Sequence, residues 1–244
     1  MTESRVCEYC GSELPMRNFA LPGHRPMMVP VACDCAQSVA AREAERAEQE
    51  RQEKIAAFSK AWDRTQVPKM FAHVKADVKG SEPLLHNRSI YISGPNGRGK
   101  THSACAIAKA YLARNTYRDS GMMRCWKSCL FVTAQDFFSR IRSSWDRWDE
   151  NEEDVFMRYA GVGLLVLDDV GKGVPSEWAA ENLFRLVNER WSNGRPMVIT
   201  SQHQMTELSE RYAKAGDETM AAMISRLGGW CDLMTLDGRD RRIA

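Results

Sequence analysis

The chain has 244 residues, 27% of them charged and 43% hydrophobic, which leaves room for one medium-sized domain plus something small and excludes wholesale disorder. Its formal net charge of +2 excludes a protein that holds nucleic acid by bulk charge, so any such contact needs a local basic patch. No apolar run is long enough to cross a membrane, and residues 1–20 lack the apolar segment of a secretory signal, so we expect a cytoplasmic protein without membrane partners.

Four of the eight cysteines lie in residues 1–36, a segment rich in Pro, Gly and Cys. In a reducing compartment, thiols at short spacing favour metal binding over disulfides, and so small a segment cannot be stabilised by burial alone. We predict a zinc-binding module whose four thiolate ligands are Cys7, Cys10, Cys33 and Cys35. The C-x-C spacing of the second pair is tighter than the usual C-x₂-C, and His24 is an alternative ligand. Buried free cysteines are the other interpretation.

Residues 37–66 are the next predicted element, a connector helix rich in Ala, Glu, Arg and Gln and without Gly or Pro. Apolar residues are sparse until Ile55, Phe58 and Trp62, whose spacing places them on one face. We therefore expect the first half of the helix to be exposed and the second half to dock onto the domain that follows, residues 67–244.

From residue 88 onward, short β-rich runs alternate with helical stretches. The predicted strands are residues 89–93, 130–133, 164–167, 197–200 and 232–236. Strands that alternate with helices are typical of a parallel sheet covered on both faces, and apolar runs without alternation are typical of its buried central strands. The pattern predicts an α/β fold with a five-stranded parallel sheet.

A phosphate-binding loop follows the first of these strands and opens a helix predicted over residues 104–114. The motif G-x-x-x-x-G-K-T consists of Gly94, Pro95, Asn96, Gly97, Arg98, Gly99, Lys100 and Thr101. Its glycines let backbone amides turn toward phosphate oxygens, and the helix N-terminus adds its positive end. We expect Lys100 to reach the β- and γ-phosphates of ATP and Thr101 to offer its hydroxyl to Mg²⁺.

A pair of acids follows the strand at residues 164–167. A carboxylate there lies at the carboxyl edge of the sheet, where open α/β sheets bind ligands. We expect Asp168 to hold Mg²⁺ through water. Two interpretations are open for Asp169: it orients or polarises the attacking water, or it is a helix cap or an indirect metal ligand.

Residues 114–147 are basic and aromatic and form a candidate DNA surface. Residues 133–136 predict a capped helix start. The apolar face of that helix, expected in the core, consists of Phe137, Ile141, Trp145 and Trp148. Arg140 and Arg147 lie off that face as candidate phosphate contacts, and Phe138 is a candidate platform for a base. A solvated charged face over an ordinary core is the alternative.

Together these motifs resemble an AAA+ ATPase of the bacterial and phage replicative-helicase loader family, the DnaC/DnaI-like proteins, which are related to the IstB-like transposition ATPases. The resemblance covers residues 67–244. Beyond the phosphate loop and the acid pair, it rests on residues 67–71, 183–184, 189–191, 198–201 and 224–227. It implies an ATPase that uses ATP and Mg²⁺ and self-associates through its ATPase domain.

The resemblance also implies roles for single residues. Arg226, in the element Ser-Arg-Leu, would be an arginine finger that contacts the γ-phosphate bound by a neighbouring subunit; an ordinary surface ion pair is the alternative. Gln202 stands at the sensor 1 position, where relatives commonly have Asn. Arg242 is the sensor 2 candidate, with Arg239 and Arg241 as substitutes or all three as a solvated basic tail.

The function that the resemblance implies is ATP-dependent loading of a hexameric replicative DNA helicase onto single-stranded DNA. Similar zinc modules begin DnaI-like loaders, where they bind the helicase, and in relatives residues 114–147 face the channel that tracks single-stranded DNA. Two alternatives stay open. One is an IstB-like ATPase that partners a transposase, and the other is a nucleotide-gated adaptor that barely hydrolyses ATP.

Overall fold

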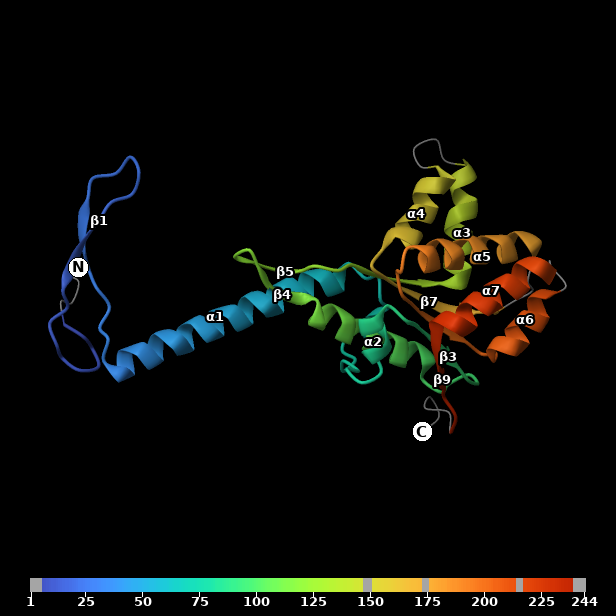
Figure 1. The fold of residues 1–244 in the computed structure, drawn as a ribbon, viewed down its shortest axis with the longest axis horizontal. Coiled ribbons are helices and arrows are strands. Elements are labelled where there is room, and N and C mark those ends of the chain that lie inside the picture. The colour runs from blue at the N-terminus through green and yellow to red at the C-terminus, as the bar shows by residue number, and fades with distance from the viewer. Residues whose placement is uncertain (1–5, 147–150, 173–175, 214–216, 239–244) are drawn as a thin grey trace. The chain divides into compact units, whose positions relative to one another are not determined.

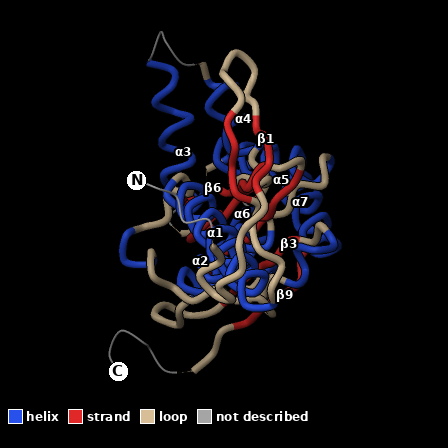
Figure 2. The backbone as a smooth tube through the Cα atoms, turned by 90° about the vertical axis from the view of Figure 1, so that its left-hand side faces the viewer, coloured by secondary structure: helices blue, strands red, loops and turns tan. Residues whose placement is uncertain are grey.

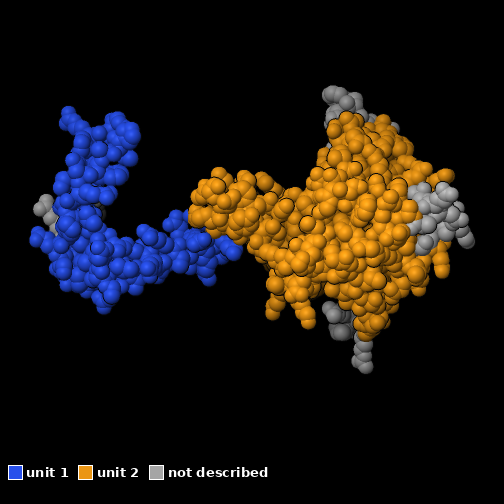
Figure 3. Space-filling view, viewed as in Figure 1, with its two compact units in different colours: residues 1–55 blue, residues 56–244 orange. Residues whose placement is uncertain are grey.

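The computed structural model describes residues 6–146, 151–172, 176–213 and 217–238. The chain divides into two compact units, residues 1–55 and 56–244 (Figure 3). The three-part division expected from the sequence, with boundaries after residues 36 and 66, stays a prediction. Within the described ranges, no helix has the length and apolar character needed to cross a membrane.

The first unit holds a small antiparallel sheet and most of a long helix (Figure 1). Strand β1 (Met16–Phe19) pairs with β2 (Met27–Pro30). Helix α1 (Ala36–Asp63) confirms the predicted connector helix but ends three residues earlier than predicted. It ends there because Thr65 folds back on the last turn, where its hydroxyl donates to the carbonyl of Trp62 at 2.7 Å.

The exposure of α1 follows the prediction with one correction. Residues 43–52 are exposed, while Phe58 and Trp62 pack against the core of the second unit and stack on each other with centroids 6.3 Å apart. Ile55 was expected on the docked face, but it is 52% exposed. The docked face therefore begins one turn later, at Phe58.

The second unit is built on a five-stranded parallel sheet, which confirms the predicted fold. In spatial order the strands are β6 (Cys129–Thr133), β7 (Leu164–Val170), β8 (Met197–Ser201), β3 (Ser89–Ser93) and β9 (Cys231–Thr235). All four pairings are parallel. Strand β7 is three residues longer than predicted and runs through the acid pair.

Helices cover both faces of this sheet (Figures 1 and 2). They are α2 (Lys100–Arg114), α3 (Ala134–Ser143), α4 (Glu152–Gly161), α5 (Glu177–Ser192), α6 (Met205–Ala213) and α7 (Asp217–Trp230). The short elements are η1 (Lys69–Phe71), η2 (Glu82–His86), η3 (Ser144–Asp146) and a hairpin of β4 (Thr116–Asp119) and β5 (Met122–Cys125).

The core has two layers because successive strand side chains point to opposite faces. In β7, Leu164 and Val166 belong to the cluster that also contains the buried side chains of α2. Leu165 and Leu167 belong to the cluster packed under α3, α4, α5, α6 and α7. Both faces of β7 are thus buried, which explains its continuous apolar run.

Helix α3 begins at the predicted cap, where the side chain of Thr133 accepts a hydrogen bond from a backbone amide. Of its predicted core face, Phe137 and Ile141 are fully buried. The prediction for Trp145 is wrong: α3 ends two residues before it, and Trp145 lies in η3 with 56% of its surface exposed. Trp148 lies outside the described residues.

Candidate nucleotide-binding site

The phosphate loop connects the end of β3 to the start of α2, as its motif predicts, although α2 begins at Lys100 rather than at residue 104. Glycine is required at both ends of the loop. A Cβ on Gly94 would lie 2.3 Å from the carbonyl oxygen of Leu236, and Gly99, the N-cap of α2, has a φ of 87°. The loop backbone can therefore turn tightly before α2 begins.

Lys100 lies within this loop. Its side chain is almost fully buried, and its Nζ donates to the carbonyl oxygen of Pro95 at 2.9 Å. This bond holds the ammonium group across the loop. The N-terminus of α2 adds its partial positive charge at the same place, so the loop is suited to bind an anion.

Asp168 is the centre of a hydrogen-bond network at the carboxyl edge of the sheet. The hydroxyl of Thr101 lies 3.1 and 3.0 Å from its two carboxylate oxygens. The hydroxyl of Thr200 donates to Oδ1 at 2.6 Å and accepts from the backbone amide of Asp169 at 2.9 Å. Burial raises the pKa of Asp168, and the hydrogen bond from Thr200 offsets part of that rise.

This donor set fits Mg²⁺, which prefers oxygen ligands. The oxygens of Thr101 and Asp168 lie 3.0 Å apart. That is about the spacing of neighbouring ligands around an octahedral ion that binds oxygen at about 2.1 Å. A cation here would also offset the cost of burying the Asp168 carboxylate. Thr101 and Asp168 are therefore suited to hold the metal that accompanies a nucleotide.

Asp169 lies in a distorted part of β7. Its φ is 57°, and the register between β7 and β8 shifts between Leu167 and Val170. Such a bulge redirects a side chain, and here it brings two successive acids to one edge of the sheet. The carboxylate of Asp169 accepts from Lys172 at 3.3 Å. The helix-cap interpretation is wrong, because Ser176 caps α5.

The comparisons with known proteins agree with this geometry. The family described as IstB-like ATP binding protein matches residues 38–244, which is most of the chain. The chain belongs to this family. The match begins within α1, ahead of the resemblance noted in the sequence, and the phosphate loop of this IstB-like protein lies within the matched residues.

Two curated relatives of the IstB-like protein are helicase loaders. The replicative helicase loader DnaC of Escherichia coli (strain K12) is 29% identical over 140 residues, 57% of this chain and 51% of DnaC. The replicative helicase loader DnaI of Bacillus subtilis (strain 168) is 25% identical over 179 residues, 71% of this chain and 53% of DnaI. The chain thus spans about half the length of the curated relatives it matches.

The fold is also shared with a solved structure. A crystal structure of DnaI aligns with a TM-score of 0.56 at 18% identity, over 72% of this chain and 95% of that chain. The expected AAA+ fold is therefore confirmed.

Three further residues of the IstB-like protein were predicted to belong to the nucleotide site. Gln202 is half-buried just after β8, but the described contact to Asp168 comes from Thr200, two residues earlier. The guanidinium of Arg226, on α7, lies over aromatic side chains of α5. Arg242 lies outside the described residues.

The role of Thr200 was missed because threonine is an ordinary strand residue, and only the pairing of β7 with β8 reveals it.

The candidate DNA residues contact neighbouring side chains. Phe138 is half-buried, with its ring edge-on to Trp178 at 5.8 Å. Arg140 donates to the hydroxyl of Tyr159 at 3.0 Å and to Gln66 at 3.2 Å. Arg147 lies outside the described residues.

The structure brings the four N-terminal cysteines together in the first unit. Their sulfur atoms all lie within 4.8 Å of one another, with Cys10 and Cys33 at 3.5 Å and Cys7 and Cys35 at 3.8 Å. Four thiolates around a zinc ion at 2.3 Å would be about 3.8 Å apart. Hydrogen bonding with Ser12 lowers the pKa of Cys10 to about 6. The cluster does not include His24, so its four sulfurs alone match a closed zinc site.

Proposed function

We propose that this protein is an ATP-dependent loader of a hexameric replicative DNA helicase onto single-stranded DNA. The observation that carries the proposal is the Thr101–Asp168–Thr200 network beside the phosphate loop, in a chain whose relatives include two helicase loaders. The network makes nucleotide hydrolysis chemically feasible, and the relatives suggest what that hydrolysis drives.

In this proposal, the chain's own residues divide the work of hydrolysis. Lys100 and the loop amides bind the β- and γ-phosphates. Thr101 and Asp168 hold Mg²⁺, which neutralises phosphate charge. Thr200 fixes the carboxylate of Asp168 and, through the Asp169 amide, the backbone of the second acid. Asp169, which is partly accessible, orients the attacking water.

Two further residues complete the proposed site. Gln202, as sensor 1, follows β8 near the same edge of the sheet. Arg226 acts in trans: it reaches the γ-phosphate of a neighbouring subunit, where its charge stabilises the transition state. Hydrolysis would then depend on self-association through the ATPase domain. Arg242 stays the proposed sensor 2 residue.

Replacement of the phosphate-loop lysine should weaken nucleotide binding while the protein stays folded. We expect Lys100→Ala to weaken ATP binding by about a hundredfold, because a buried charge-assisted contact is removed. Isothermal titration calorimetry with ATP and Mg²⁺ measures this. Lys60→Ala, an exposed position on α1, is the matched control and should bind like the wild type. Wild-type affinity in Lys100→Ala would refute the assignment.

We also propose that the N-terminal module binds one zinc ion per chain and contacts the helicase. Elemental analysis of protein purified without chelators should find one zinc per chain. Cys33→Ser should lose the metal and keep ATP binding, because the phosphate loop lies in the other unit. Cys125→Ser, which changes a cysteine outside the cluster, should retain the zinc. A metal-free but folded N-terminal module in the wild type would contradict the proposal.

The proposed DNA contacts are Phe138, Arg140 and Arg147. They are supported by the basic and aromatic character of residues 114–147. The proposal predicts that single-stranded DNA changes the ATP turnover of the assembled protein. A turnover rate that is negligible with and without single-stranded DNA would instead favour the nucleotide-gated adaptor.

Identification of the partner tests the function itself. Affinity capture from native lysate with ATP present, followed by mass spectrometry, should recover a replicative helicase. Lys100→Ala is the matched control, since it should not respond to added ATP. Recovery of a transposase would favour the alternative, an IstB-like transposition ATPase, which the family match keeps in consideration.

A further inference from the structure

Two aromatic side chains of α5 lie against the guanidinium of Arg226. Its central carbon is 5.1 Å from the ring centroid of Phe184 and 5.5 Å from that of Trp191. Both distances are within the range of attraction between a cation and an aromatic ring. Arg226 therefore sits in an aromatic clamp, which we define as Phe184 and Trp191.

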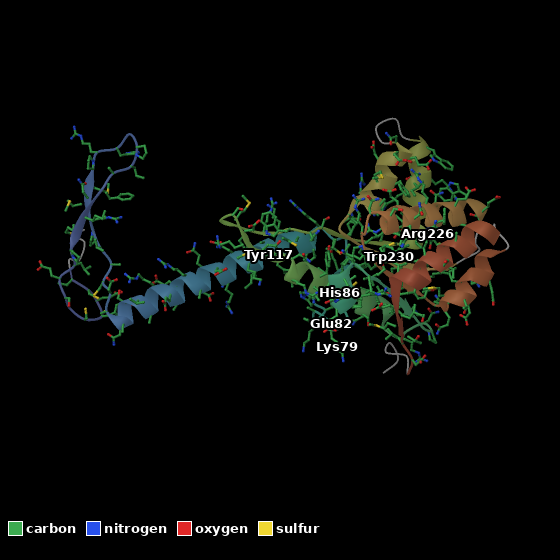
Figure 4. The ribbon with its side chains drawn as sticks, viewed as in Figure 1. Lys79, Glu82, His86, Tyr117, Arg226 and Trp230 are labelled. Carbon is green, nitrogen blue, oxygen red and sulfur yellow. The ribbon has the colours of Figure 1, made fainter. Side chains whose placement is uncertain are left out.

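The helices that carry these residues explain why the clamp forms. Phe184 and Trp191 are seven residues apart, which places them on the same face of α5 two turns from each other. Helix α7 packs against α5, and Arg226 lies on α7 (Figure 4). Two rings from one helix thus lie against one side chain from the other.

The environment of Arg226 is unusual for a residue that only packs. Its Nε is buried without a hydrogen-bond partner, and no described acid forms an ion pair with its guanidinium. Trp191 is 46% exposed, although an indole is a large apolar group that normally gains from burial. The clamp thus holds the inner part of the guanidinium against two aromatic rings. No acid among the described residues pairs with the terminal N–H groups.

We propose that Phe184 and Trp191 are positioning residues that hold Arg226 ready for the γ-phosphate of a neighbouring subunit. This inference rests on the proposed trans action of Arg226. Rings attract the cation without using its N–H donors, so those donors stay available for phosphate oxygens. A carboxylate in the same place would neutralise the arginine, whereas the clamp restricts its rotamers and preserves its charge.

Removal of one ring tests the clamp. We expect Trp191→Leu to lower kcat for ATP about tenfold with KM nearly unchanged, because the arginine acts on the transition state and not on ATP binding. Trp191→Phe keeps a ring and should retain most of the activity. Phe184→Leu should lower kcat similarly. Trp62→Leu is the matched control, since it removes an indole that contacts a different cation, Lys109, outside both the clamp and the candidate DNA surface.

Mixed assemblies show whether the defect lies in positioning. Trp191→Leu chains keep their own phosphate loop and Asp169, so mixing them with Asp169→Asn chains should restore activity, because those neighbours supply an intact clamp and Arg226. A general structural defect would not be rescued. Unchanged kcat in Trp191→Leu and Phe184→Leu, or no rescue in mixed oligomers, would overturn the clamp. Full turnover in Arg226→Ala would refute the proposed trans action of Arg226 itself, and not only the role of the clamp.

Discussion

Replacement of Arg226 by alanine should lower ATP turnover by about a thousandfold and leave ATP affinity nearly unchanged. The physical reason is that Lys100 and the loop amides of the same chain bind the phosphates, whereas Arg226 would stabilise charge that develops only in the transition state. Steady-state turnover and ATP titration measure the two effects separately. Turnover per chain of the wild type should also rise with protein concentration, because assembly supplies the missing arginine.

A mixture of two inactive variants decides whether Arg226 acts in trans. In assemblies of Arg226→Ala and Asp169→Asn chains, some interfaces pair an intact Asp169 with an intact Arg226 from the neighbour. Activity should therefore partly return. A cis-acting arginine cannot be rescued in this way, since every chain would carry a defect in its own site. A mixture that forms mixed oligomers and stays inactive would refute the trans finger and favour the nucleotide-gated adaptor.

Replacement of Arg190 should have the largest effect on stability. This side chain is fully buried on α5, and burial lowers its pKa from the usual value of a guanidinium. Its two terminal nitrogens donate to five backbone carbonyl oxygens, those of Tyr159, Ala160, Val162, Gly163 and Pro196. It thereby ties the end of α4 to the backbone that enters β7 and β8.

Arg190→Met should lower the free energy of unfolding by about 3–5 kcal/mol, because buried carbonyls lose their donors. For a domain of this size we expect the melting temperature to fall by roughly 10 °C. Arg195→Met is the matched control, since Arg195 contributes one weaker bond, 3.4 Å, to the carbonyl of Ala160. Chemical denaturation measures the difference. Equal stability of the two variants would show that the five bonds are not a major source of stability.

Elements that depend on local pattern could be predicted from the order of residues alone. The phosphate loop was predictable because its glycines and Lys100 have fixed spacing between a strand and a helix. The five strands were predictable because strands buried on both faces need continuous apolar residues. The cluster of four cysteines was predictable because two pairs of thiols at short spacing, in a segment too small for a core of its own, are typical of a shared ligand site.

Which side chains from different elements contact one another depends on how the chain folds. Thr200 reaches Asp168 because β8 pairs with β7, and neither residue's neighbours in the sequence indicate that pairing. Trp145 is exposed because α3 ends before it, although helical spacing placed it in the core.

The bonds of Arg190 and the clamp on Arg226 likewise join segments that are distant in sequence. The carbonyls that Arg190 binds lie up to 31 residues away, and the rings that lie against Arg226 belong to a different helix. Local sequence patterns determine the spacing of hydrophobic residues, the turns and the caps of each helix or strand. Contacts between elements depend on strand order and helix packing, which the fold as a whole determines.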